Sequence, residues 1–375
     1  MKTKKIGIVT HYYDSVNYGG CLQAYALTHV LKGMGYDACQ ISYKFRLGSP
    51  MPPRSLKDRV KRMVERVFYS ARFKRRRRAF SAFRDAIPHS EQVYDGSSIG
   101  ETADLYDVFI TGSDQVWNTS WYRSAFFLDF VGNGKTKLSY AASLGRPTLS
   151  DEEREKMRKS LRDYTAISVR EQDAVPLLSD LTEKTVEWTL DPTLLLSCDE
   201  WNKVSSERRI KRKYLFCYFL STDKRTRRLA TEYAREKGLT VVTLPHFPFT
   251  FSKNDFMFGD VHLYDVTPND FISLIKNAEC VFTDSFHAAV FSNLYKKEFF
   301  VFDRLYASEM KTRILTLLPL FGTEARFCRE ENFTLSHLLS VGEIEYGQTS
   351  EYFDSLVKRS RDFLKNAIKN GAVNE

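Results

Sequence analysis

The chain has 375 residues, of which 43% are hydrophobic and 14% aromatic, a composition that fits a globular protein with room for two domains and excludes a disordered one. No apolar stretch approaches the roughly 18 residues of a bilayer-spanning helix, and the apolar run after the basic N-terminus is too short for a secretory signal. The six cysteines lack CxxC spacing, which favours reduced thiols in a cytosolic protein over a zinc site or a disulfide framework.

The net charge of +9 is concentrated in one part of the chain. Residues 44–84 contain 15 lysines and arginines but two acidic residues, a surplus of 13 positive charges, so the rest of the chain carries a net −4. This segment includes the run RFKRRRR, Arg72–Arg78. Such a run is typical of a solvated helix face, or of a surface that meets an anionic membrane or a polyanionic substrate. Nucleic acid is disfavoured as a partner because no recognisable nucleic-acid module is present.

Apolar strands alternate with amphipathic helices along the first part of the chain. The basic segment at about 44–90 interrupts this alternation and is predicted to be a helical insertion. A polar stretch at 197–213 is predicted to link two halves. The strands predicted before it are 5–10, 36–43, 106–112, 137–143 and 165–170, the helices are about 19–35 and 150–164, and the segment 186–196 closes this half.

The alternation starts afresh after this linker. The predicted strands are 214–220, 239–245, 280–284 and 298–303, and the predicted helices are 223–238, 268–279 and 286–297. A last amphipathic helix at about 350–370 is expected to cross back to the first half. This order predicts an α/β fold of two Rossmann-like domains, whose parallel sheets face a central cleft. The expected boundaries are 1–200, 213–345 and 350–375.

Ligands of open parallel sheets lie beyond the carboxyl ends of the strands, so the turns after strands are the candidate site. Ordinary turns use Gly, Asn and Ser. Three turns here also carry cationic or titratable side chains, which are Arg170, His287, and Arg304 with Arg313. We therefore expect these turns to face a ligand.

Two loops of the first half are candidates for binding. In NYGGCLQA, Gly19 and Gly20 precede a helix, where they let the backbone approach an anion or serve only for packing. In TGSDQVWN, Trp117 is either a sugar platform or a buried residue. The polar neighbours that would take sugar hydroxyls are Asp114, Gln115 and Asn118, with Asp14 and Asn17 lining the same side.

The sequence allows two interpretations of the role of Arg170 and two of the role of His287. Arg170 directly follows a strand, where it pairs with Glu171 or binds an anion. His287 starts a helix, where it caps the helix or contacts a phosphate or carboxylate.

Six motifs together resemble the polysaccharide pyruvyl transferase family. They span residues 5 to 302 in the family's order: KIGIVTHYYDSVNYGGCLQAYAL, VFITGSDQVWN, LSYAASLG, SVREQD, DPTLLL and TDSFHAAVFSNLYKKEFFVF. The resemblance implies a two-domain, GT-B-like fold. It also implies phosphoenolpyruvate as donor co-substrate, a sugar of a surface polysaccharide or its lipid-linked precursor as acceptor, and a pyruvyl ketal as product.

The resemblance carries over unevenly to single residues. Arg170 matches the family's strand-end arginine and His287 its histidine before a helix. Some members have Arg-Leu-His where this chain has Ser285-Phe286-His287, so one donor-binding arginine is absent. Arg304 or Arg313 is the candidate to replace its charge.

These observations assign expected roles. Arg170, Ser285, His287, Arg304 and Arg313 are expected on the donor side, with His287 also a proton donor. Asp114 is the candidate catalytic base or sugar ligand. No metal or other cofactor is demanded, because no HxxxH or DxD cluster stands out.

Two other readings stay open. One is a GT-B-like glycosyltransferase that uses a nucleotide-sugar, although no clear base or ribose motif is present. The other is a non-catalytic glycan- or anion-binding protein. For the main reading, a lipid-linked acceptor implies a cytoplasmic protein that works at the inner membrane face, and Arg72–Arg78 could hold it there.

Overall fold

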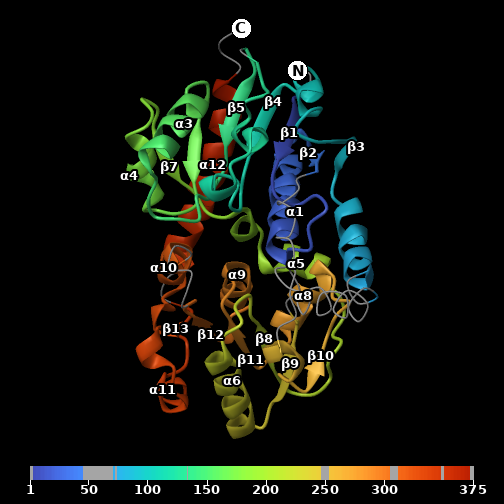
Figure 1. Ribbon diagram of the computed structural model, residues 1–375, viewed down its shortest axis with the longest axis vertical. Coiled ribbons are helices and arrows are strands. Elements are labelled where there is room, and N and C mark those ends of the chain that lie inside the picture. The colour runs from blue at the N-terminus through green and yellow to red at the C-terminus, as the bar shows by residue number, and fades with distance from the viewer. Residues whose placement is uncertain are drawn as a thin grey trace, which may run out of the picture.

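The computed structural model describes residues 3–44, 71, 74–132, 134–245, 253–304, 311–347 and 350–371. The chain forms two Rossmann-like domains that follow one another along the long axis of the molecule (Figure 1). The expected residue boundaries of the domains stay predictions, and each domain is named here by its sheet.

The N-terminal domain is built on a five-stranded parallel sheet with the order β3-β2-β1-β4-β5. Its strands are β1 (Lys5–Val9), β2 (Asp37–Tyr43), β3 (His89–Tyr94), β4 (Val108–Thr111) and β5 (Thr136–Ser139). The chain direction across the sheet reverses between β1 and β4, which makes this the switch point of the domain. A parallel pair, β6 (Ile167–Val169) and β7 (Val186–Trp188), extends the sheet through single bridges from β6 to the β5 edge.

The C-terminal domain repeats this arrangement in a six-stranded parallel sheet with the order β10-β9-β8-β11-β12-β13. Its strands are β8 (Tyr214–Tyr218), β9 (Thr240–Thr243), β10 (Val261–His262), β11 (Cys280–Thr283), β12 (Glu298–Phe302) and β13 (Phe327–Cys328). Its switch point lies between β8 and β11. Both sheets therefore follow the Rossmann order, with the first strand of each domain at the centre.

Helices connect successive strands and cover the sheets (Figure 1). Capping boxes begin α3 and α8, where Ser150 and Thr267 accept hydrogen bonds from the third helical residue. The helices are α1 (Tyr18–Gly33), 74–85, α3 (Asp151–Leu161), α4 (Ala174–Ser179), α5 (Cys198–Val204), α6 (Lys224–Lys237), α7 (Lys253–Phe256), α8 (Pro268–Lys276), α9 (Phe286–Leu294), α10 (Lys311–Leu317), α11 (Leu335–Ser340) and α12 (Ser350–Asn370).

The expected linker at 197–213 is not simply irregular. It begins with α5, whose N-cap Ser197 forms a capping box with Glu200. Trp201 of this helix is fully buried, and its indole nitrogen donates to the carbonyl of Thr193 at 3.0 Å. The connection between the domains is thus packed into the core.

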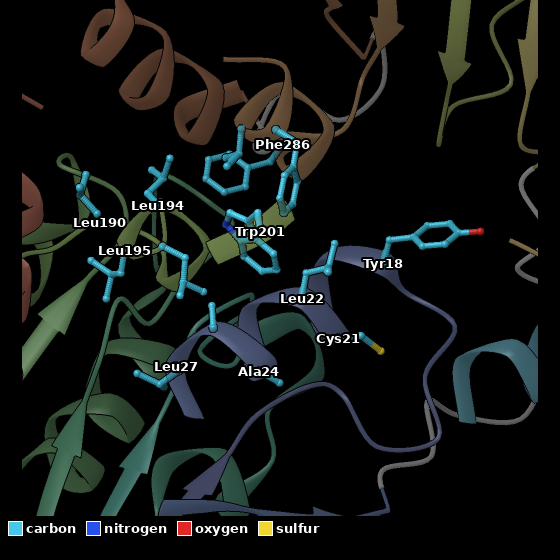
Figure 2. Close-up of a cluster of buried hydrophobic side chains, with 14 of the residues drawn as sticks. Tyr18, Cys21, Leu22, Ala24, Leu27, Leu190, Leu194, Leu195, Trp201 and Phe286 are labelled. Carbon is cyan, nitrogen blue, oxygen red and sulfur yellow. The ribbon is translucent and has the colours of Figure 1, made fainter. Parts of the chain in front are cut away.

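One hydrophobic cluster runs through both domains. Figure 2 shows Leu22 of α1 beside Trp201 of α5, near Phe286 of α9 and Leu194 of the interdomain connection, whereas Tyr18 of α1 points away from this group within the same cluster. Tyr18 reaches furthest across: its ring stacks on a phenylalanine of α8 at 4.6 Å, and its hydroxyl donates to the carbonyl of Val266 at 3.2 Å. The domains are therefore joined by apolar packing, which holds the two switch points in a defined relation.

The inserted basic segment departs from a plain helix. Helix 74–85 is followed by β3, a half-exposed edge strand, where the sequence predicted only helix to about residue 90. Its apolar face packs inward, with Phe80 and Phe83 in the core. Arg76 is buried too: it donates to the carbonyl of Pro245 at 3.0 Å and lies over the Tyr18 ring. Residues 45–70, which contain the segment's other apolar residues, lie outside the described ranges.

Helix α12 contacts β5 of the N-terminal domain and η4 (Pro192–Leu195). Ser360 accepts a hydrogen bond from the Leu190 amide at 3.0 Å, and the carbonyl of Ile368 accepts one from Lys4 at 2.8 Å. The buried stripe of α12 thus closes one face of the first sheet. Among the described residues, no helix is both long and apolar enough to cross a bilayer.

Candidate active site

The candidate site lies where the loops after β4, β6, β7, β11 and β12 meet. Asp114 follows β4, Arg170 follows β6 and Asp191 follows β7. From the other domain, His287 lies in the first turn of α9, after β11. Both switch points contribute, because parallel strands place the loops at their carboxyl ends together.

Asp191 is the centre of the polar network on the N-terminal side. Its side chain is fully buried. One carboxylate oxygen accepts from the amide and hydroxyl of Thr193 at 3.0 and 2.6 Å. The other accepts from Arg170 Nη1 at 2.8 Å and from Ser113 Oγ at 3.1 Å. These four donors hold the carboxylate in one orientation.

Arg170 is surrounded by three carboxylates. Beside its bond to Asp191, its Nη2 lies 3.8 Å from Asp114 and its Nε lies 3.6 Å from Glu171. The Phe286 ring lies 4.6 Å from the guanidinium carbon. The predicted ion pair with Glu171 is confirmed, Arg170 also contacts two further acids, and binding of an anionic ligand stays a prediction.

The charges of this cluster support one another. Burial alone would disfavour the carboxylates, but His287 and Arg170 outweigh it and hold the pKa of Asp191 far below its usual range. The pKa of Asp114 is lowered as well, because Arg170, His287, His11 and Arg313 outweigh its burial. Burial works against the Arg170 charge, yet its acidic neighbours raise its pKa. The acids and Arg170 are therefore ionised together.

His287 bridges the two domains. Its Nε2 lies 3.6 Å from the Asp191 carboxylate, which is longer than a hydrogen bond. Its Nδ1 faces Gly19 of α1, where an added Cβ would come within 1.9 Å of that nitrogen. Gly19 is thus needed for the approach of His287, whereas the sequence suggested packing or the approach of a ligand. Gly20 is needed for a similar reason, since its Cβ would lie 2.5 Å from the His11 carbonyl oxygen.

Arg313 of α10 reaches the same site, but its electrostatic environment differs from that of Arg170. It is buried, and among the described residues no carboxylate forms an ion pair with it. With its amide oxygen turned toward the guanidinium, Gln115 accepts from both terminal nitrogens at 3.0 and 3.2 Å. Burial and the nearby Arg170 charge lower the pKa of Arg313 to about 10, although Glu171 and Asp114 oppose this. Its charge is therefore poorly compensated.

Several buried polar atoms around this centre lack a hydrogen-bond partner among the described residues. Buried polar groups are normally bonded, so a group of such atoms indicates space for a ligand or ordered water. Four of these atoms are nitrogens that can donate to an anion, namely Nε and Nη2 of Arg170, Nε2 of His287 and Nε of Arg313, and a fifth is the acceptor Oε2 of Glu171.

The remaining donor-side candidates flank this centre. Arg304 donates to the carbonyl of Asp284 at 2.7 Å. The Asp284 carboxylate accepts from the amides of Leu220 and Ser221 at 2.6 and 2.8 Å, which fixes the loop after β8. Ser285 is the N-cap of α9 but makes no capping bond with its side chain. A small cavity beside them is lined by cationic, acidic and apolar side chains, among them Arg304, Lys311, Arg313 and Asp284.

The acceptor-side candidates divide into three groups. Asn17 lies at the site: its amide nitrogen is 3.4 Å from Asp114, and it caps α1. The side-chain amides of Asn118 and Gln115 lie 2.9 Å apart at the edge of the site, and Asn118 donates to Gln115 only when the Gln115 oxygen is turned away from Arg313. Asp14 is exposed and paired with Arg77.

The structure corrects the prediction that Trp117 binds the acceptor sugar. Its side chain is fully buried, stacks on Phe127, and donates from its indole nitrogen to the Phe126 carbonyl at 3.2 Å. A ring enclosed in the N-terminal core cannot pack on a sugar. The buried reading of this tryptophan is the right one.

Sequence reasoning missed two residues of the site, Asp191 and His11. Asp191 stands in DPTLLL, a motif used only for the resemblance, and Thr193 two residues later was a possible signal for a held carboxylate. Burial lowers the pKa of His11 to about 4, with Asp114 opposing the shift. No group of His, Cys, Asp and Glu suited to a metal occurs in the part of the chain that the structure describes.

The two Rossmann-like domains with a charged site between their switch points define a GT-B-like fold. Three solved structures share the fold, each assigned as a UDP-N-acetylglucosamine 2-epimerase. The protein of Listeria monocytogenes is 12% identical, with a TM-score of 0.57 and coverage of 100% of this chain and 98% of that one. The Rickettsia bellii enzyme is 11% identical, with a TM-score of 0.53 and coverage of 99% and 97%. The Neisseria meningitidis enzyme, bound to UDP-GlcNAc, is 11% identical, with a TM-score of 0.52 and coverage of 98% and 100%.

The family is established from the sequence. The profile of the polysaccharide pyruvyl transferase family matches residues 17–306, more than three quarters of the chain, so the protein belongs to that family and is a transferase. No curated protein matches the chain at a significant level. The matched span includes Asp114, Arg170, Asp191 and His287, whereas Arg313 lies beyond it.

Proposed function

We propose that this protein transfers the enolpyruvyl group of phosphoenolpyruvate to a sugar of a surface polysaccharide or its lipid-linked precursor, forming a pyruvyl ketal. The observation that carries this proposal is the buried, poorly compensated charge of Arg313 beside the unpartnered donors of Arg170 and His287. Phosphoenolpyruvate brings a carboxylate and a phosphate, the two anions that such donors bind best.

The proposed donor side uses three cationic groups. Arg313 takes over the charge that the family's arginine supplies where this chain has Ser285, since Arg313 and Asp284 line one cavity. Arg170 presents Nε and Nη2, which lie 3.6 and 3.8 Å from Glu171 and Asp114 without a hydrogen bond, and Arg304 flanks the same cavity. Their charges would stabilise the phosphate as it departs.

The proposed reaction adds one sugar hydroxyl to C2 of phosphoenolpyruvate while a proton is delivered to the C3 methylene, which becomes a methyl group. The C–O bond to phosphate then breaks, and a second hydroxyl of the sugar adds to C2 and closes the ketal. The two hydroxyl protons end on the methyl group and on phosphate. His287 is the candidate to deliver the first proton, and the ionised Asp114, near Asn17, is the candidate base for the sugar hydroxyl.

Ligand-induced stabilisation tests the donor. Phosphoenolpyruvate should raise the melting temperature of the protein in proportion to the logarithm of its concentration, whereas UDP-GlcNAc should not. Inorganic phosphate and pyruvate serve as ligand controls, and Glu298→Gln, at the opposite end of β12 from Arg304, serves as the protein control. Stabilisation by UDP-GlcNAc alone would replace the proposal with a nucleotide-sugar transferase. No response to any donor would favour a non-catalytic glycan-binding protein.

We also propose that the protein acts in the cytoplasm at the inner membrane face, where a lipid-linked acceptor would be presented. Lys74, Arg75 and Arg78 are exposed on helix 74–85 and support attraction to anionic lipid, worth about 1 kcal/mol for each cation near the surface. Arg76 and Arg77 do not count fully toward this patch, because Arg76 is buried and Arg77 pairs with Asp14.

A further inference from the structure

The geometry points to Asp191 as a positioning residue that orients the His287 imidazole across the domain interface. The sequence motifs did not assign it a role. The inference rests on the proposed function in one respect only, namely that His287 acts on the donor.

The position of the Asp191 carboxylate is set entirely by the N-terminal domain and its exit loop. Thr193, Ser113 and Arg170 fix both oxygens with four hydrogen bonds of 2.6 to 3.1 Å. Pro192 follows immediately and begins a short helix, so the backbone at Asp191 is also restrained. A carboxylate that already has four donors does not need a fifth for its own stability, and His287 is nevertheless aimed at it.

His287 approaches this carboxylate from the C-terminal domain. Its side chain is 8% exposed, and its Nε2 has no hydrogen-bond partner among the described residues. Gly19 closes off the Nδ1 side of the ring. The imidazole therefore lies between a carboxylate held by four hydrogen bonds and the backbone of α1 at Gly19, and its Nε2 is 3.6 Å from Asp191, close enough for a small shift to form a hydrogen bond.

Catalytic hydrogen bonds are often long without substrate and tighten in the complex. We infer that Nε2–H donates to Asp191 in the complex with the donor. Asp191 thereby fixes the tautomer of His287. Because the two partners lie in different domains, this hydrogen bond ties the orientation of His287 to the packing between the domains.

The first test needs no substrate activity. Selective labelling of histidine with nitrogen-15 gives an imidazole N–H signal for His287 that is identified by its loss in His287→Gln. In wild-type protein saturated with phosphoenolpyruvate, and to a lesser extent in free protein, we expect a sheltered, downfield Nε2–H signal. Asp191→Ala should abolish this signal, and Asp191→Asn, which keeps the size of the side chain, should shift or broaden it. Glu298→Gln removes a different ion pair, that with Arg326, and should leave it unchanged.

The second test is kinetic. Asp191→Asn should lower kcat by on the order of 10- to 100-fold, the cost of removing the carboxylate partner of a functional histidine in metal sites. The KM for phosphoenolpyruvate should change far less, because Asp191 faces His287 and not the donor. A purely structural role would lower the melting temperature without this split between kcat and KM.

The outcomes separate the two proposals. If wild-type protein shows no transfer with phosphoenolpyruvate, the proposed function fails, while the free-protein signal still decides the role of Asp191. An unchanged His287 signal in Asp191→Asn, together with a wild-type kcat where transfer is measurable, overturns the positioning role. Should Asp191→Ala not fold, the isosteric Asp191→Asn decides alone.

Discussion

The two sides of the interdomain site each contain a buried arginine, and the two arginines are in opposite electrostatic states. Arg170, on the N-terminal side, contacts three carboxylates, and its pKa is raised. Arg313, on the C-terminal side, has the amide of Gln115 as its partner, and its pKa is lowered to about 10. The same residue type is thus satisfied in one half of the site and unsatisfied in the other.

This difference separates the residues that hold the site together from those that bind the donor. A buried charge with partners holds a structure together, whereas a buried charge without a counter-ion is costly and is best explained by a ligand that supplies the missing charge. We therefore interpret the N-terminal side as a prebuilt frame of acids and the C-terminal side as the place where the donor's anions complete the charge balance.

Replacing each arginine by methionine, which has a similar length and no charge, tests this interpretation most strongly. Arg170→Met leaves Asp114, Glu171 and Asp191 without their cation, so the free energy of unfolding should fall by roughly 3–5 kcal/mol and transfer should be lost. Arg313→Met removes an unsupported charge and should change the free energy of unfolding by less than about 1 kcal/mol. Urea unfolding of both variants measures the contrast, and equal losses of stability would contradict it.

The next effect concerns the contact between α1 and α9. Gly19→Ala should lower turnover at least about 100-fold, because its Cβ would displace the His287 ring that acts on the donor. The isolated helix should tolerate alanine, which has the higher helix propensity. In the His287→Ala background the ring is gone, so adding Gly19→Ala should cost no further stability. Additive losses in this double-mutant cycle would show that the glycine serves another contact.

Donor affinity should distinguish Arg313 from its neighbours. Arg313→Met should weaken binding of phosphoenolpyruvate by roughly 1.5–3 kcal/mol, the usual worth of a hydrogen bond to a charged group. Adding Ser285→Arg places an arginine where some family members have one and should restore part of the lost affinity. Isothermal titration measures both steps. Full affinity in Arg313→Met would mean that this arginine does not replace the family's missing cation.

A smaller effect is expected at helix 74–85. The triple variant Lys74→Ser, Arg75→Ser, Arg78→Ser removes exposed charge and should reduce co-sedimentation with anionic vesicles at low salt, without lowering the melting temperature. Arg76→Ser is the matched contrast: it should destabilise the protein, because Arg76 bonds to Pro245 and lies over Tyr18. Equal binding of wild type and triple variant across salt concentrations would exclude this patch as the anchor.

The last effect concerns His11 and pH. Burial lowers its pKa from 6.5 to about 4, so the folded protein keeps His11 neutral while the unfolded chain takes up a proton below pH 6.5. The stability linked to this group is complete above pH 6.5 and is lost between about pH 6.5 and pH 4. The difference in melting temperature between wild type and His11→Gln should narrow across this window. A constant difference would contradict the burial of a neutral histidine.

Much of the fold could be predicted from the sequence, because hydrophobic period and turn residues act over neighbours in the chain. The central strands and the helices between them follow directly from this pattern. The edge strands β3, β10 and β13 were missed for a physical reason: each is short or half-exposed, so its residues carry little apolar signal.

The site was predictable in part. Position after a strand was enough to select Asp114, Arg170, His287 and Arg313, since in parallel sheets such positions converge. Burial was not readable from the chain: Trp117 and Arg76 stand among polar or charged neighbours but are enclosed by residues distant in sequence.

The amino-acid sequence by itself determined the two α/β domains, the family and the strand-end residues that the family shares, because these depend on local patterns and ordered motifs. Only the tertiary structure decided which charges are satisfied. Asp191 meets Arg170 across 21 positions of sequence, and Gly19 meets His287 from the other domain, and no local pattern specifies such partners. The packing between the domains sets these distances, and with them the difference between an arginine that organises the site and one that remains available to a donor.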